Sequence, residues 1–305
     1  MSLVEKALRK LQESGKDPSA PPTADAQASG GRPEAPLPAG PQAHAHGPMV
    51  PIERGALRAA GLLAPQEDLQ LLVRQYRKIK QPLIDRAMGR GAPRLPKGYL
   101  IMIASAMAGE GKSFTAVNLA LSLALEKDLR VLLVDADVAK PHLSHVLGRG
   151  EAPGLLDALR DPATDIEAFI SPTDLPTLSF LPAGTGSEEA AELLASARMA
   201  QLAAQLGAND PQRVIVFDSS PLLQTTEAVT LSHVAGQIVV VVRAEFTPQP
   251  VLLDALKLLG GHPSVSLVLN QSIRSVTSAY YYYGYGESGV SPPVAGGRDL
   301  HHDGG

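Results

Sequence analysis

The sequence lacks cysteine and tryptophan entirely and has little phenylalanine. Its 305 residues include no Cys, no Trp and 5 Phe. Without cysteine the chain can form no disulfide, no thiolate metal site and no cysteine nucleophile. Aliphatic side chains must therefore build the core, and the five tyrosines that gather between positions 280 and 285 cannot be there for core packing.

Two further absences limit the class of protein. No uncharged apolar run reaches the roughly 18 residues of a membrane-spanning helix, and charges at Glu5 and Lys6 argue against a signal peptide. The formal charge of -4 excludes a globally basic nucleic-acid binder. We therefore expect a soluble, cytoplasmic protein that binds no nucleic acid and that reaches a membrane only through a partner.

The N-terminal part of the chain divides by composition into three stretches. Residues 1–16 predict an amphipathic helix, because Leu3, Leu8 and Leu11 fall on one face. Residues 17–51 predict a disordered linker, since 21 of these 35 residues are Ala, Gly or Pro.

Residues 52–96 predict a helical, basic region for oligomerisation or partner contact. Helical periodicity runs over residues 66–80, and Pro82 is expected to perturb or end that helix. From Arg74 to Lys97 there are eight basic residues and one acidic residue. This stretch suits an anionic membrane leaflet or an acidic face of a neighbouring subunit, although a solvated helix face explains it too.

Residues 97–274 predict one α/β domain with a mostly parallel, doubly wound sheet. Continuous apolar runs indicate strands buried on both faces, and these alternate with helical patterns. The expected strands are 100–104, 131–134, 178–181, 214–217, 238–242 and 265–269. The expected helices are 111–126, about 188–206, 227–233 and 249–260. Residues 275–305 form a tail in which this pattern is lost.

The first chemical motif is a phosphate-binding loop between the first strand and its helix. Residues 106–113 read AMAGEGKS, which matches the loop pattern with Ala106 at the first glycine position. Backbone N–H groups of such a loop hold a phosphate chain. The predicted nucleotide-binding residues are Ala108, Gly109, Glu110, Gly111, Lys112, Ser113 and Phe114.

Two acidic motifs follow buried strands. Asp135 and Asp137 end the second strand, and Asp218 ends the strand 214–217. Ligands bind at the carboxyl ends of parallel strands, and like charges there are costly without a cation or a proton between them. We therefore expect Mg²⁺ at Ser113, Asp137 and Asp218, which leaves Asp135 to act on an attacking hydroxyl.

Together these motifs resemble those of the bacterial tyrosine autokinases (BY-kinases), in particular the exosortase-associated subgroup, whose relatives are the Min-type and Par-type P-loop ATPases. Residues 1–12, 77–83, 192–196 and 279–287 resemble that subgroup as well. The partition ATPases carry a second lysine in the loop where this chain has Met107, which favours the kinase branch.

The resemblance implies an activity and a role. It implies an ATP- and Mg²⁺-dependent tyrosine autokinase, with Lys112 and Asp135 catalytic, that controls exopolysaccharide polymerisation and export. Its partners would be copies of itself in a ring and a membrane chain-length protein as activator. The residues phosphorylated in trans would be Tyr280, Tyr281, Tyr282, Tyr283 and Tyr285.

Some assignments stay open. Asn270 ends the last strand, where it can read an adenine edge or simply form a turn. The family's acidic motif usually carries Arg where this chain has Ala139, followed by Lys140. The family's ring helix, Glu-x-x-Arg-x-x-Arg, maps onto Arg74, Arg77 and Lys80, so its Glu is replaced.

Two rival functions are compatible with the same motifs. One is a nucleotide-switched ATPase that hydrolyses ATP with water and positions a membrane partner. The other is an ATP-binding scaffold without catalysis, whose aromatic tail stacks on sugars or proteins.

Overall fold

The computed structural model describes residues 47–91 and 93–272. The expected N-terminal helix (1–16), residues 17–46 of the expected linker and the tyrosine-containing tail (275–305) lie outside the described residues. The described part is built on a seven-stranded sheet with the order β3-β4-β2-β5-β1-β6-β7. Every pairing is parallel except that of β3 with β4, which confirms the predicted mostly parallel α/β fold.

The strands lie where the apolar runs predict them, and the structure adds a short edge strand. Their bounds are β1 (Leu100–Ser105), β2 (Arg130–Ala136), β3 (Ser171–Pro172), β4 (Leu178–Leu181), β5 (Arg213–Ser219), β6 (Gln237–Arg243) and β7 (Val265–Asn270). The central strands β1, β2 and β5 are buried on both faces. Such strands need apolar side chains at successive positions, which explains their unbroken apolar runs.

The predicted full burial of the strand 265–269 is wrong. β7 pairs only with β6 and forms an edge of the sheet. Leu267 is 39% exposed and Leu269 is 64% exposed. An apolar run thus located the strand, but its burial depends on neighbours that this edge does not have among the described residues.

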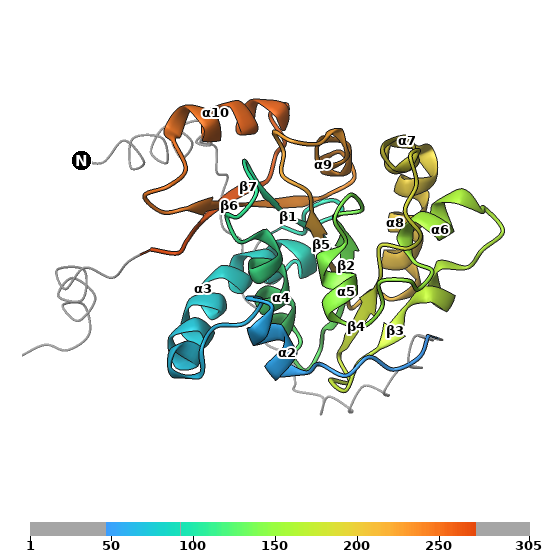
Figure 1. The fold of residues 1–305 in the computed structure, drawn as a ribbon, viewed down its shortest axis with the longest axis horizontal. Coiled ribbons are helices and arrows are strands. Elements are labelled where there is room, and N and C mark those ends of the chain that lie inside the picture. The colour runs from blue at the N-terminus through green and yellow to red at the C-terminus, as the bar shows by residue number, and fades with distance from the viewer. Residues whose placement is uncertain (1–46, 92, 273–305) are drawn as a thin grey trace, which may run out of the picture. The chain divides into compact units, whose positions relative to one another are not determined.

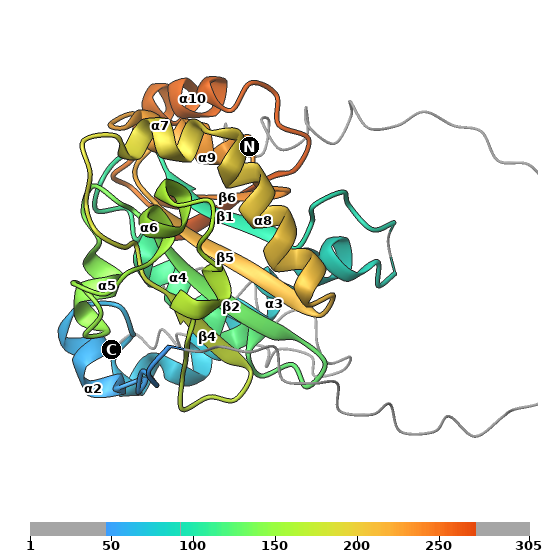
Figure 2. The ribbon, with the colours of Figure 1, turned by 90° about the vertical axis from the view of Figure 1, so that its right-hand side faces the viewer.

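Helices cover both faces of the sheet (Figure 1). On one face α2 to α5 pack over a core that includes Leu119, and on the other α6 to α10 pack over a core that includes Phe217. In Figure 2, α8 runs along β5, with which it is in contact. The helices are α2 (Arg54–Ala59), η1 (Gln66–Asp68), α3 (Leu69–Met88), α4 (Lys112–Leu123), α5 (His142–Val146), α6 (Leu155–Arg160), η2 (Ile166–Phe169), α7 (Ala190–Ala195), α8 (Ala197–Asn209), α9 (Thr226–Ser232) and α10 (Gln249–Leu258).

The helix α3 corrects two expectations. Of the two outcomes expected at Pro82, a perturbed helix or its end, the end is wrong, because α3 runs through Pro82 to Met88. Lys80 is 5% exposed, since its Nζ donates to the Ser122 carbonyl at 2.6 Å and pairs with Glu126 at 2.7 Å. It therefore faces α4 and does not belong to an exposed basic face. Among the described helices, none has the length and apolar composition needed to cross a membrane.

The long helix expected over about 188–206 is instead two helices. Ser196 has an extended backbone (φ -71°, ψ 154°) between α7 and α8, and its hydroxyl donates to the Leu193 carbonyl at 2.6 Å. Serine competes with helical hydrogen bonding in this way. The chain therefore turns at Ser196, and both helices still bury leucines in the same core cluster.

Residues 47–51, expected as the end of the linker, pack against the edge of the sheet. The Gly47 amide donates to the Ile170 carbonyl at 3.0 Å, and the Val50 amide donates to the Pro172 carbonyl at 2.8 Å. Val50 is 2% exposed and forms a parallel bridge with Thr173. Residues 47–59, from this segment to the end of α2, are called the N-terminal cover.

Candidate active site

The phosphate-binding loop lies where the motif predicts it, between β1 and α4. Gly109 (φ 79°) and Gly111 (φ 97°) both adopt left-handed backbone conformations, which glycine reaches without the steric cost of a Cβ. α4 begins immediately afterwards at Lys112. Its first N–H groups and the loop amides form the kind of backbone site that binds a phosphate chain.

Glu110 belongs to the phosphate-binding motif, but its side chain is bonded within the protein. Its side chain is fully buried; one carboxylate oxygen accepts from the Met107 amide at 2.7 Å and the other from the Thr247 hydroxyl. The carboxylate thus braces the loop against the β6–α10 connection. Of the polar groups of Glu110, the backbone N–H remains for a phosphate.

Asn270 lies beside the loop. Its Nδ2 donates to the Glu110 carbonyl at 2.9 Å, and a Cβ on Gly111 would overlap that nitrogen. The structure therefore brings Asn270 to the loop that the sequence predicted, through the last strand of the sheet.

Phe114, in the first turn of α4, accepts at its carbonyl a 2.7 Å hydrogen bond from Asn118.

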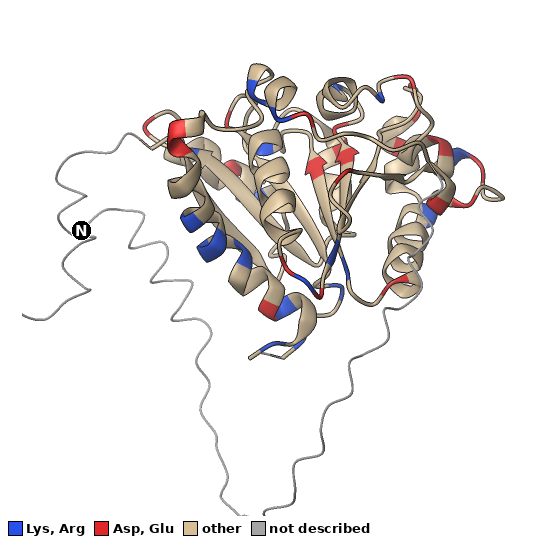
Figure 3. Cartoon of the chain, turned by 90° about the horizontal axis from the view of Figure 1, so that it is seen from below, with Lys and Arg blue, Asp and Glu red and all other residues tan. Residues whose placement is uncertain are grey.

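The carboxylates converge at the carboxyl ends of β2 and β5. Asp135 and Asp218 are Cα partners in the parallel pairing of these strands and are 0% and 1% exposed. Figure 3 shows the acidic colour at the tips of two neighbouring strands. Asp137 is half-buried and accepts from the Ser220 hydroxyl at 2.8 Å.

Burial and mutual repulsion disturb the titration of this cluster. Burial raises the pKa of Asp218 to about 8, and the nearby charge of Asp135 adds to the rise, while a Ser113 hydrogen bond and Lys112 oppose it. Burial also raises the pKa of Asp135 to about 6, against hydrogen bonds from Ser144. Two acids held side by side in this way favour a cation or a shared proton between them.

The residues present fit a hard cation. Asp135 Oδ1 and Asp218 Oδ1 are buried and have no hydrogen-bond partner among the described residues. In the same part of the chain no three His, Asp or Glu side chains form a self-contained metal site. Mg²⁺ commonly takes one or two carboxylates and completes its shell with phosphate oxygens and water. Such a donor set is what Ser113, Asp137 and Asp218 offer.

Several residues that hold this site carry no local signal in the sequence. Ser144, on the unpredicted helix α5, donates from both its amide and its hydroxyl to Asp135 Oδ2. Thr247 braces Glu110 from more than a hundred residues away.

Lys140, considered as a substitute for the family's arginine, is exposed. The five tail tyrosines lie outside the described residues.

Comparisons with known proteins agree with this geometry. A family model described as the CobQ/CobB/MinD/ParA nucleotide binding domain matches residues 101–259. The chain is 31% identical over 237 residues to the tyrosine-protein kinase YwqD of Bacillus subtilis, and the match covers 76% of this chain and 94% of YwqD. The chain belongs to the bacterial tyrosine-kinase family.

Other relatives resemble the chain over part of their length. Succinoglycan biosynthesis transport protein ExoP of Rhizobium meliloti is 35% identical over 160 residues, which cover 52% of this chain and 20% of ExoP. The chain likewise covers 24% to 26% of several further kinase relatives. The solved BceF tyrosine kinase domain superposes with a TM-score of 0.55 at 27% identity and covers 72% of this chain and 91% of that domain.

Proposed function

We propose that this bacterial tyrosine kinase uses ATP and Mg²⁺ to phosphorylate tyrosines in the C-terminal tails of neighbouring copies. The proposed acceptors are Tyr280, Tyr281, Tyr282, Tyr283 and Tyr285. The observation that carries the proposal is the convergence of the phosphate-binding loop with two adjacent buried carboxylates, Asp135 and Asp218, at one edge of the sheet.

The chemistry follows from this arrangement. The loop amides from Ala108 to Gly111 hold the phosphate chain, and the ammonium group of Lys112 stabilises the charge on the transferred phosphoryl group. Ser113, Asp137 and Asp218 would hold Mg²⁺, which when bound neutralises charge on the phosphates. Phosphoryl transfer depends chiefly on positioning and charge stabilisation, so this small set of groups suffices.

The acceptor phenol must lose a proton, because its ordinary pKa is about 10. We assign that proton to Asp135. As the tyrosine oxygen bonds to the γ-phosphorus, the bond from that phosphorus to the β-bridging oxygen breaks and ADP leaves. Asn270 supports the loop through the Glu110 carbonyl, and we propose the adenine edge as its second contact.

The proposed partners are further copies of this chain and a membrane chain-length protein. Lys and Arg are gathered along α3 (Figure 3), including the exposed Arg74 and Arg77. A positive helix face favours an acidic partner surface. The proposed role is control of exopolysaccharide polymerisation and export, at the cytoplasmic side of the inner membrane.

The experiment is intact-mass analysis of the full chain after incubation with ATP and Mg²⁺, with the cytosolic segment of a candidate chain-length protein added. Wild type should gain mass in steps of one phosphate, all within residues 280–285. Lys112→Met should gain none. Lys257→Met is the matched control, because Lys257 is exposed and, in the part of the chain that the structure describes, pairs only with Asp254 in α10.

The alternatives give different results. ATP consumed without a mass gain would identify a nucleotide-switched ATPase. ATP bound but not consumed would identify a scaffold. Phosphate outside the tail would retain the kinase and overturn the proposed acceptors.

A further inference from the structure

The short helix α5 places one serine directly against Asp135. The amide and the hydroxyl of Ser144 each donate to Asp135 Oδ2 at 2.7 Å. Ser144 is 1% exposed, so these bonds do not compete with water. Asp135 Oδ1 is buried without a hydrogen-bond partner among the described residues. One oxygen of the carboxylate is therefore fixed, while the other is left for a reacting group.

The direction of the Ser144 hydroxyl is itself determined. Its oxygen accepts a hydrogen bond from the Ala183 amide at 3.1 Å, so its own proton is directed at Asp135. The segment that carries Ala183 is held in turn by α6, because the Leu155 and Leu156 amides donate to the Pro182 and Ala183 carbonyls at 2.9 Å each. Asp135 is thus connected through Ser144 to the loop that follows β4.

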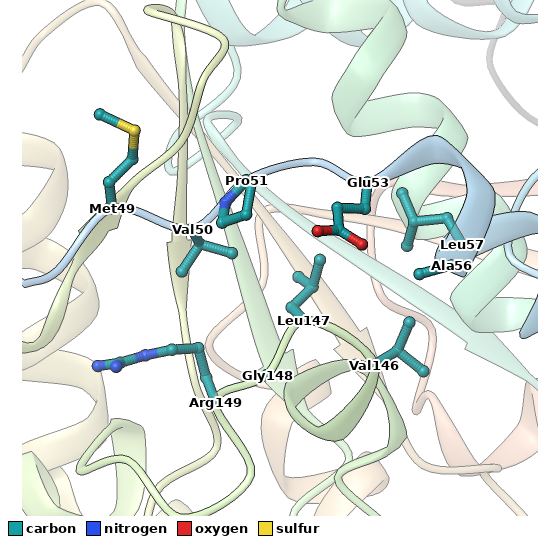
Figure 4. Close-up of a pocket in the computed structure, with 10 residues that line it drawn as sticks. All are labelled: Met49, Val50, Pro51, Glu53, Ala56, Leu57, Val146, Leu147, Gly148 and Arg149. Atoms are coloured by element: carbon teal, nitrogen blue, oxygen red, sulfur yellow. The ribbon is translucent and has the colours of Figure 1, made fainter.

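The outer side of α5 is held by the N-terminal cover. A helix of five residues is not stable by itself. Leu143 in α5 and Leu147 just after it pack with Ile52 and Leu57. Beside this contact lies a cavity of about 350 Å³, in which Val146 and Leu147 face Glu53 and Leu57 (Figure 4). The position of Ser144 is therefore set by tertiary packing on both sides of α5.

We propose that Ser144 is a positioning residue for phosphoryl transfer, which holds Asp135 so that its free oxygen meets the acceptor hydroxyl. This inference rests on the proposed function, because it requires Asp135 to take a proton from that hydroxyl. A misplacement of about 1 Å in a reacting group can lower a rate by about 10²-fold. A serine of this kind should therefore affect turnover and leave nucleotide binding unchanged.

The test is a double-mutant cycle on the full chain with the same activator segment. It measures kcat and the KM for ATP in wild type, Ser144→Ala, Asp135→Asn and the double variant. Ser144→Ala should lower kcat by about 10- to 100-fold with KM within about two-fold of wild type. In the Asp135→Asn background the same change should have no further effect, since residues that act through one group are not additive.

Two further comparisons separate positioning from folding. Ser232→Ala is the matched control, because Ser232 is 2% exposed and its hydroxyl donates to the Val229 carbonyl in α9, away from the carboxylates. If Ser144→Ala does not fold, Ser144→Thr and Ser144→Val replace it, since these two side chains have the same shape and differ in the hydroxyl. Thr should then exceed Val in kcat by about ten-fold or more.

Each result has one meaning. Two results would overturn the role of Ser144 and leave the kinase intact. One is a kcat for Ser144→Ala equal to that of Ser232→Ala. The other is a loss of kcat from Ser144→Ala that is as large in the Asp135→Asn background as in wild type. Wild type that consumes ATP and gains no phosphate would overturn the proposed function. The same four proteins are then compared by their rates of ATP hydrolysis. Additive effects of Ser144→Ala and Asp135→Asn on that rate would overturn the inference as well.

Discussion

Asp135 and Asp218 lie side by side across the parallel pairing of β2 with β5. The alignment follows from two similar runs, because Val131 pairs with Val214 and each run places its aspartate after four apolar residues. Equal lengths of buried strand thus bring two carboxylates to the same level, next to the phosphate-binding loop. The pair is unfavourable in the free protein and favourable once a cation lies near it.

We expect the protein free of nucleotide and Mg²⁺ to lose stability as the pH rises from about 4 to about 8. The raised pKa values mean that the folded state retains protons that the unfolded state releases above the ordinary carboxyl pKa of about 4, so this stabilisation falls from there until the pH has passed the folded pKa values. Asp218→Asn should reduce the slope by up to about 1.4 kcal/mol per pH unit.

Urea unfolding at several pH values in a chelating buffer measures this slope. Asp254→Asn, on an exposed helix position, should keep the wild-type slope. Equal slopes in wild type and Asp218→Asn would show that Asp218 does not titrate in this range.

Gly111→Ala should weaken ATP binding more than Gly109→Ala. Both glycines have positive φ, so both substitutions strain the backbone by a similar amount. A Cβ at Gly111 would also overlap Asn270 Nδ2, whereas one at Gly109 would meet nothing within 4 Å. Isothermal titration with ATP and Mg²⁺ measures the difference. Gly111→Ala should cost less ATP affinity in an Asn270→Gly background than in wild type; an equal cost in both would contradict the contact.

Thr247→Val should loosen the phosphate-binding loop without touching the nucleotide. The change removes the hydroxyl that donates to Glu110, and a lost hydrogen bond to a buried charged group costs about 1.5–3 kcal/mol. We expect a lower melting temperature and weaker ATP binding together. Thr226→Val serves as control, because its hydroxyl meets Glu227 at an exposed position. A stable variant with normal affinity would remove the bracing role of Glu110.

Glu167→Ala should destabilise the fold by at most about 3–5 kcal/mol, since it leaves the buried Arg213 with Asp210, 3.9 Å away, as its remaining acidic partner among the described residues. The two side chains form a buried pair with N–O distances of 2.6 and 3.1 Å between η2 and β5. Asp254→Ala breaks an exposed pair with Lys257 and should change stability by less than about 1 kcal/mol. Chemical unfolding compares the two, and similar small effects would show that the buried pair is water-accessible.

The sequence by itself determined six of the seven described strands, the phosphate-binding loop and the acidic strand ends. Apolar runs locate buried strands because the pattern is local, and the loop pattern needs only a strand before it and a helix after it. The approach of Asp135 to Asp218 was predictable because parallel strands share one carboxyl edge.

Only the tertiary structure decided which side of each element is covered. β7 carries a buried-strand pattern and is an edge, α3 continues through Pro82, and Lys80 faces inward. Periodicity reports the local pattern, whereas exposure depends on neighbours that are distant in the chain. The same reason hides Ser144, because its hydrogen bonds to Asp135 exist only after α5 has packed between the N-terminal cover and the loop that follows β4.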